Sequence, residues 1–393
     1  MRKTIKRLGA VLLAMAMAVS VLCTGALAAD TTYTLTIQDS NAYHTYTAYQ
    51  VFAGTVDENK KLSVTGWGSG VNTSKKVGEK TLVQAIQDIT DDTNHKKPFE
   101  GKTEPGDIAA VLGDTSNNSK NSAVAAAFAN VVANYVTDDG HSTTTWTATT
   151  DGTPAHYRIT DLTGGYYFVK STNKEDSTTD VANTRYMLEV VGNATVEAKN
   201  GVPTVDKTVQ NANNTNTNFA DTTTAQVGQT VNFKLTGTLP SNYNYYKNYA
   251  YTFDDTLSEG LTLTEEQKDA LFVKVYASQT EADSDKDGSF DTVGSKLAAN
   301  NYTVNVTSNS DANTTSLKVV FTDLKTIKAD NTDALITKDS VIVVYYSATI
   351  NGSATVGAAG NKNSVKLEYS NDPNNTGTGT TKSDEVSVFT FKL

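Results

Sequence analysis

Apolar and polar residues alternate along most of this chain, in short runs separated by Gly, Pro, Asn and Asp. A period of two is typical of strands with one buried face. In the C-terminal half the runs include "TVDKTVQ", "TVNFKLTGTL", "YAYTFDDTL", "TSLKVVFTDL", "SVIVVYYSATI" and "NSVKLEYS". Short strands at this spacing predict that residues 201–393 form an immunoglobulin-like β-sandwich.

The N-terminal half, residues 30–200, combines strands with helices. Alternating runs stand near its two ends, among them "TYTLTIQD", "AHYRITDL", "GGYYFVKST" and "RYMLEVVG". Two segments between them repeat apolar residues at helical spacing, namely Leu82, Ile86 and Ile89, then Val124, Phe128, Val131 and Tyr135. The pattern predicts a mainly β protein of two tandem sandwiches, the first with inserted helices. Gly201 and Pro203 mark the boundary between them.

The first 29 residues have the form of a signal peptide. A basic stretch, "MRKTIKRLG", precedes the apolar run "AVLLAMAMAVSVLCTG" and the small-residue cleavage site Ala26–Ala28. The apolar run is short for a membrane anchor, so we expect cleavage. The only cysteine, Cys23, lies inside this segment after Leu22, which argues against lipid attachment and leaves no cysteine for disulfides.

Composition narrows the function classes. The net charge is −10 and no basic stripe with interleaved aromatics is visible, so we expect no nucleic-acid partner. Tyrosines number 19 against 12 phenylalanines, which suits strands with one wet face and a surface protein. The four histidines are scattered, and no phosphate-binding, dinucleotide or nucleophile-elbow motif occurs. We expect no cofactor and no metal.

Three strands of the second domain each place one polar residue on the face that should point inward. They are Lys207 in "TVDKTVQ", Asp255 in "YAYTFDDTL" and Asn363 in "NSVKLEYS". An isolated buried charge would cost several kcal/mol of effective solvation. Burial lowers the pKa of a lysine and raises that of a carboxyl, so a neutral amine and a protonated acid can coexist there.

Together these three groups can form a covalent bond. The acid would hydrogen-bond the carbonyl of Asn363, the amine of Lys207 would attack it, and ammonia would leave. The product is an isopeptide bond between the first and last strands of the sandwich. The alternative is a satisfied buried polar cluster without chemistry. The pattern alone leaves both open.

Residues 201–390 resemble the isopeptide-forming (Cna B-like) domain of the backbone pilins that sortases assemble on Gram-positive bacteria. The resemblance rests on "PTVDKTV", "VGQTVNFKLTGTLP", "YTFDDTLSEGLTL", "VYYSATIN" and "GNKNSVKLEYSNDP", in the family's order. It implies that Lys207 and Asn363 are cross-linked and that Asp255 is the catalytic acid. Asn361 is the nearest rival partner, but it precedes the settled alternation.

The first domain resembles the N-terminal pilin domain through "TYTLTIQD", "TYTAYQVFAGTV" and "ITDLTGGYYFVKST". Its first strand has no lysine, so we expect no cross-link there. In "ATVEAKNG", alternation places Lys199 on an exposed face, and the resemblance implies that it accepts the sortase-carried C-terminus of the next subunit. Glu197 and Ala198 replace the family's Tyr-Pro, and an ordinary solvated lysine is the alternative. Neither an LPxTG-like signal nor a glutamate box is found.

These inferences predict a structural subunit of a cell-surface pilus, exported by the Sec pathway and not an enzyme beyond its single self-cross-linking. Its partners would be neighbouring pilin subunits, a pilus-type sortase and, as a further candidate, host surface ligands. The alternative is an adhesin that binds host matrix or glycan through exposed aromatics, for which Tyr243–Tyr249 is the candidate. A glycan-active enzyme would need two facing carboxylates in an open cleft.

One acidic run resembles a calcium loop. "DSDKDGSFD" spaces Asp283, Asp285, Asp287 and Asp291 two to four residues apart. The twelfth position holds Gly294 instead of glutamate, and we expect strands on both sides. A polar hairpin turn is therefore the favoured interpretation.

Overall fold

The computed structural model describes residues 31–90, 96–113, 118–143, 145–150, 152–173, 182–198, 201–213, 218–289, 292–328, 335–374 and 376–391. The chain divides into two compact units, Met1–Ser171 with Arg185–Ala198, and Thr172–Thr184 with Lys199–Leu393. The assignment of Thr172–Thr184 to the second unit was not foreseen from the sequence. The expected signal peptide lies outside the described residues. Within the described ranges no helix is long and apolar enough to cross a membrane.

The first unit contains two sheets. One has the order β5 (Trp146–Thr147), β6 (His156–Leu162), β1 (Tyr33–Gln38) and β9 (Ala194–Glu197). The other has the order β3 (Leu62–Trp67), β2 (His44–Val56), β7 (Gly165–Asn173) and β8 (Arg185–Val190), with β4 (His141–Ser142) paired to β2. β9 runs parallel to β1, whereas β6 runs antiparallel to it.

The first unit also carries the inserted helices. Both expected helices are confirmed, as α1 (Leu82–Gln87) and α3 (Asn118–Val132). A further helix between them, α2 (Pro105–Gly113), was missed. The sequence did contain a signal for this helix, because Pro105 stands at its first position, where proline is favoured. α2 buries Ile108 and Ala109.

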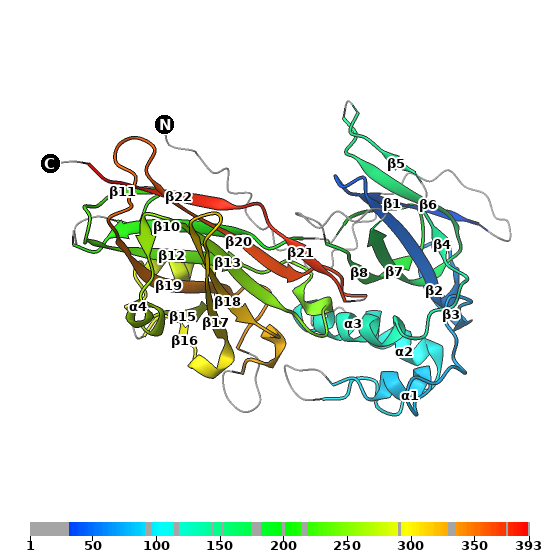
Figure 1. Cartoon of the computed structure of the whole chain (residues 1–393). Helices are drawn as coiled ribbons and strands as arrows, with labels where there is room; N and C mark the ends of the chain where they lie inside the picture. The colour runs from blue at the N-terminus through cyan, green and yellow to red at the C-terminus, as the bar shows by residue number, and fades with distance from the viewer. Residues whose placement is uncertain are drawn as a thin grey trace. The chain divides into compact units, whose positions relative to one another are not determined.

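The second unit is a sandwich of two larger sheets (Figure 1). One has the order β10 (Val205–Asn211), β12 (Thr230–Thr238), β19 (Val341–Ile350), β15 (Phe272–Tyr276) and β16 (Ser295–Lys296), with β14 (Leu261–Thr262) paired to β19. The other has the order β11 (Thr222–Thr224), β22 (Asp384–Phe389), β20 (Asn361–Ser370), β13 (Tyr251–Ser258), β18 (Thr314–Phe321) and β17 (Thr303–Asn309), with β21 (Thr378–Thr380) paired to β20. The short helices are α4 (Glu265–Asp269), α5 (Gln279–Ser284), η2 (Tyr243–Tyr245), η3 (Ala299–Asn301) and η4 (Leu324–Thr326).

The inward faces of these two sheets form one hydrophobic core. Phe233 and Val344 contribute from one sheet, and Phe253 and Leu367 from the other, all fully buried. The outward face of β19 is buried as well, because Val343 and Tyr345 pack with Ala282 of α5. This explains the nearly continuous apolar run of β19, which a strand with one wet face would not show. The mainly β fold class is confirmed.

The order of strands corrects one expectation. Asn363 lies on β20, which is followed by β21 and β22, so it does not lie on the last strand. The last strand nevertheless contacts the first, since the backbone N–H of Lys207 donates to Asp384 Oδ2 at 2.6 Å. A Lys207–Asn363 bond would therefore join β10 to β20, across the two sheets.

Candidate functional site

The three polar residues singled out from the sequence converge in the interior of the second unit. Lys207 is 1% exposed, and Asp255 and Asn363 are fully buried. On the paired strands β13 and β20, Asp255 is opposite Val365 and Leu257 is opposite Asn363, so the two polar residues are diagonal neighbours on one face. Lys207 reaches them from β10, in the other sheet.

A fourth residue, Tyr346 on β19, connects all three. Its hydroxyl donates a hydrogen bond to Asp255 Oδ2 and accepts one from Asn363 Nδ2 at 2.6 Å. The ammonium of Lys207 donates to Asp255 Oδ1 at 2.5 Å and lies 3.3 Å from the Tyr346 hydroxyl. Sequence reasoning missed Tyr346 because a tyrosine on a core face is counted as apolar.

The surroundings of these four groups are apolar and aromatic. The rings of Phe233 and Tyr346 are stacked, with centroids 5.0 Å apart. Lys207 Nζ lies 5.0 Å from the Phe233 centroid. A cation over an aromatic face regains part of its lost hydration energy, yet far less than water would provide.

Burial shifts the pKa of each of the three ionisable groups in the site. It lowers the pKa of Lys207 to about 8, against the opposing attraction of Asp255. Burial raises the pKa of Asp255, although its bonds to Lys207 and Tyr346 act in the other direction. The pKa of Tyr346 is raised well above its usual value for the same reason. Both shifts favour a neutral amine beside a protonated acid over the ion pair.

The carboxamide of Asn363 is only half satisfied. Its Oδ1 is buried and has no hydrogen-bond partner among the described residues. We expected Asp255 to bond this carbonyl, but Tyr346 lies between them and takes the amide nitrogen instead. A buried acceptor without a partner costs about 1–3 kcal/mol. This cost argues against a cluster retained only for satisfied hydrogen bonding.

The rival residue Asn361 is placed differently. Its Oδ1 accepts from the Thr355 backbone N–H at 2.8 Å, and its Nδ2 donates to the carbonyls of Thr355 and Val388 at 3.2 and 3.1 Å. Both ends of this amide hold backbone together, and no bond to Lys207 is found for it in the part of the chain described. Asn361 therefore has a structural role, because it connects the backbone at Thr355 to the backbone of β22 at Val388.

The acidic run at residues 283–291 contributes the carboxylate of a second buried lysine–carboxylate pair, whose lysine lies on β15. Asp285 is fully buried and accepts from Lys274 Nζ at 2.5 Å and from the Tyr276 hydroxyl at 2.9 Å. Asp283 lies in α5, so a helix and not a strand precedes the run, whereas β16, which pairs with β15, follows it as expected. Asp291 falls outside the described residues. No group of three or more potential metal ligands is found where the chain is described.

Two other expectations concern surface residues. Lys199 falls outside the described residues, so its exposure stays a prediction. The tyrosines expected to line an aromatic groove are buried instead, and the ring of Tyr249 packs against those of Tyr243 and Tyr246. These tyrosines are Tyr243, Tyr245, Tyr246 and Tyr249, at 1%, 7%, 3% and 0% exposure. The candidate adhesin groove at this position is therefore wrong.

The first unit has its own buried polar cluster. Asp39 accepts hydrogen bonds from His44 Nδ1 at 2.7 Å and from the Tyr46 hydroxyl at 2.8 Å. No lysine is buried among the described residues of this unit. The expectation that it forms no cross-link stays a prediction.

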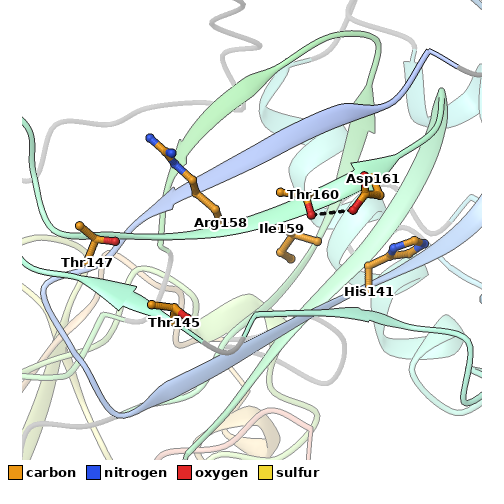
Figure 2. Close-up of a pocket in the computed structure, with 7 residues that line it drawn as sticks. All are labelled: His141, Thr145, Thr147, Arg158, Ile159, Thr160 and Asp161. Carbon is orange, nitrogen blue, oxygen red and sulfur yellow. Dashed lines mark hydrogen bonds between the residues drawn. The ribbon is translucent and has the colours of Figure 1, made fainter.

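A depression of about 490 Å³ lies beside β6 in the first unit. Figure 2 shows Arg158 and His141 at opposite ends of it. The Thr160 hydroxyl donates a hydrogen bond to Oδ2 of its neighbour Asp161 at 2.8 Å. Among the described residues that line it, Ile159 is the one apolar residue and Asp161 the one carboxylate. Ligand sites are mostly apolar and glycan-cleaving sites need two carboxylates, so this depression has the features of neither.

Comparisons with known proteins return structural similarity only. No family model and no curated protein matches the chain. Among solved structures, similar ones are the T6 backbone pilin of serotype M6 Streptococcus pyogenes (16% identity, 93% of this chain and 65% of that one, TM-score 0.49) and the fimbrial protein FimP of Actinomyces oris (14%, 91% and 68%, 0.46). The major pilin SpaD of Corynebacterium diphtheriae is a third (12%, 92% and 67%, 0.38).

These similar structures are major pilins and fimbrial subunits of Gram-positive bacteria. The chain spans 65% of the length of the T6 pilin. At these identities the likeness concerns the fold.

Proposed function

We propose that the chain is a structural subunit of a bacterial surface pilus, whose second unit ties its two sheets together by an isopeptide bond between Lys207 and Asn363. The observation that supports this most is the burial of Lys207, Asp255 and Asn363 around one tyrosine hydroxyl. The motifs around these residues, which resemble those of backbone pilins, add to it. The signal peptide predicted for residues 1–29 fits export to the cell surface.

Asp255 acts as the acid of this single-turnover reaction. Its carboxyl is held by Lys207 on one oxygen and by Tyr346 on the other, and burial keeps its pKa raised. It takes a proton from the attacking amine and supplies one for the departing ammonia. No separate substrate is involved, so the protein is not an enzyme in the usual sense.

Replacing Asp255 tests the reaction. The wild-type chain should be lighter than its sequence by one ammonia, whereas Asp255→Ala should keep the full mass and unfold at a lower temperature. The variant lacks the cross-link and also leaves Lys207 buried without its acid, and this second effect alone typically costs about 3–5 kcal/mol. Asp255→Asn, which keeps the shape, provides a second variant.

Asp254→Ala is the matched control. Asp254 precedes Asp255 on β13 and faces the other side of the sheet. Its Oδ2 lies 3.4 Å from Lys318 Nζ. It should lose ammonia like the wild type. Full sequence mass in the wild-type chain, after folding has been verified, contradicts the proposal.

We further propose that subunits are joined through Lys199 by a pilus-type sortase. The proposal rests on "AKNG" at residues 198–201, where the first unit ends and the second begins, and on the alternation of β9, in which Glu197 is exposed. Co-expression with such a sortase and a full-length subunit should give covalent ladders that disappear in Lys199→Ala. The exposed Lys76→Ala is the control. Ladders that persist in Lys199→Ala reject this role.

A further inference from the structure

The hydroxyl of Tyr346 lies between the acid and the amide nitrogen that must leave. We propose that Tyr346 is a catalytic residue, which relays a proton from Asp255 to Asn363 Nδ2 during bond formation. The inference rests on the proposed function, since it assigns a role within the same reaction. Tyr346 lies within the motif "VYYSATIN", but neither the resemblance nor the alternation pattern gave it a role.

The hydrogen bonds form one uninterrupted path between the attacking and the leaving nitrogen. Lys207 Nζ bonds Asp255 Oδ1 at 2.5 Å, Asp255 Oδ2 bonds the Tyr346 hydroxyl, and that hydroxyl bonds Asn363 Nδ2 at 2.6 Å. All four residues are at most 5% exposed. Because bulk water is kept away, protons have to move through side chains.

Each proton can be followed through the reaction. The Lys207 Nζ–Asn363 Cγ bond forms as the neutral amine attacks, and the amine gives one proton to Asp255 Oδ1. Asp255 releases its own proton from Oδ2 to Tyr346, and Tyr346 passes its hydroxyl proton to Nδ2. The Cγ–Nδ2 bond then breaks and ammonia leaves. Asp255 and Tyr346 end in their starting protonation states.

The direction of the tyrosine hydrogen bonds must reverse during the reaction. An intact amide nitrogen is a donor only, because its lone pair is delocalised into the carbonyl. After attack the carbon is tetrahedral and Nδ2 becomes an amine that accepts a proton. A phenol can donate and accept in turn. Since burial raises the pKa of Tyr346, its hydroxyl stays protonated and ready to donate.

Refolding kinetics test the relay. Full chains recovered in denaturant are diluted into buffer, stopped at intervals and weighed intact. Tyr346→Phe keeps the ring that stacks on Phe233 but removes the hydroxyl, and ammonia loss should slow about 100-fold, the lower end for general acid–base catalysis. Tyr345→Phe makes the same change on the opposite face of β19 and should react like the wild type.

Several outcomes overturn the relay. Equal rates in Tyr346→Phe and the wild type reject it while leaving the cross-link intact. A wild-type chain that folds without losing ammonia rejects both the relay and the proposed function. Slowing by the same factor in Tyr345→Phe shows that folding, and not proton transfer, was affected.

A fluorinated tyrosine at position 346 keeps the proposal testable if Tyr346→Phe fails to fold. Ring fluorination preserves the hydroxyl and its hydrogen bonds but makes the phenol more acidic. A relay predicts a changed rate of ammonia loss at 346 and an unchanged rate at 345. Unchanged rates at both positions contradict a proton-transfer role for Tyr346.

Discussion

A buried lysine is a poor means of stabilising a sandwich. Lys207 and Asp255 have fully buried side chains, and such a pair typically contributes less than well-packed apolar residues of the same volume would. The Oδ1 of Asn363, which has no hydrogen-bond partner among the described residues, adds a further cost. These penalties become understandable if the groups are reactants, because bond formation removes the amine altogether.

The pH dependence of the reaction follows from the two shifted pKa values. The reactive pair carries one proton, shared between the amine of Lys207 and the carboxyl of Asp255. Below the raised pKa of Asp255 the pair holds two protons and the amine is blocked. Above the lowered pKa of Lys207, about 8, it holds none and ammonia cannot be protonated. The rate should therefore be bell-shaped.

Refolding of the wild-type chain at different pH values measures this profile. We expect ammonia loss to slow about tenfold per pH unit above pH 8, as one proton is lost. A lysine with its usual pKa would sustain the rate to above pH 10. A rate that is constant between pH 7 and 10 would show that burial does not set the ionisation of Lys207.

Strand register places the reactants, and this much could be predicted from the sequence. Alternation alone placed Lys207, Asp255 and Asn363 on inward faces, because each side chain of a strand takes one of two sides. Alternation could not identify Tyr346 as a polar contact, since it does not tell which residues meet across the two sheets. Alternation in "EVSVFTFKL" does predict one further strand after Asn363, but the three-residue β21 is too short to show such a pattern.

The second buried pair was missed for a different reason. On β15, Lys274 shares a face with Phe272 and Tyr276, a pattern like that of Lys207. This face points away from the sandwich core, and only the placement of α5 over it buries the pair. Whether an outer face is covered depends on a distant segment, and the sequence pattern of the strand does not record it.

The Lys274–Asp285 pair should hold α5 and its following turn against β15. Asp285→Ala leaves the Lys274 ammonium buried and should lower the free energy of unfolding by about 3–5 kcal/mol. The exposed Asp283→Ala should change it by about 0.5 kcal/mol or less. Urea denaturation measures both. Equal effects would contradict the structural role of the pair.

For the molecule as a whole, the bond would turn one unit into a closed covalent loop. It would connect the first strand of the second unit to β20, and nearly all of the sandwich lies between these two points in the sequence. Partial unfolding that starts at β10 could then not spread by separating the sheets. A subunit under tension that has no disulfides would need this resistance to separation of its sheets.

The double variant Lys207→Met/Asp255→Leu isolates the contribution of the bond to stability. It exchanges both members of the buried pair for apolar side chains of similar volume, so the loss of the pair itself should be nearly neutral. By analogy with cross-links that close loops of 100 residues or more, the wild type should be more stable by about 4–5 kcal/mol. Protease digestion near the melting temperature should degrade the double variant first. Equal survival of both chains would contradict a mechanical role.

Peptide mapping of the wild-type chain tests the central claim most directly. Digestion with trypsin should yield one branched peptide that joins the Lys207 segment to the Asn363 segment, lighter than their sum by one ammonia, with no cleavage after Lys207. Fragmentation should place the branch on Asn363 and not on Asn361. Two separate unmodified peptides, with cleavage after Lys207, would contradict the cross-link.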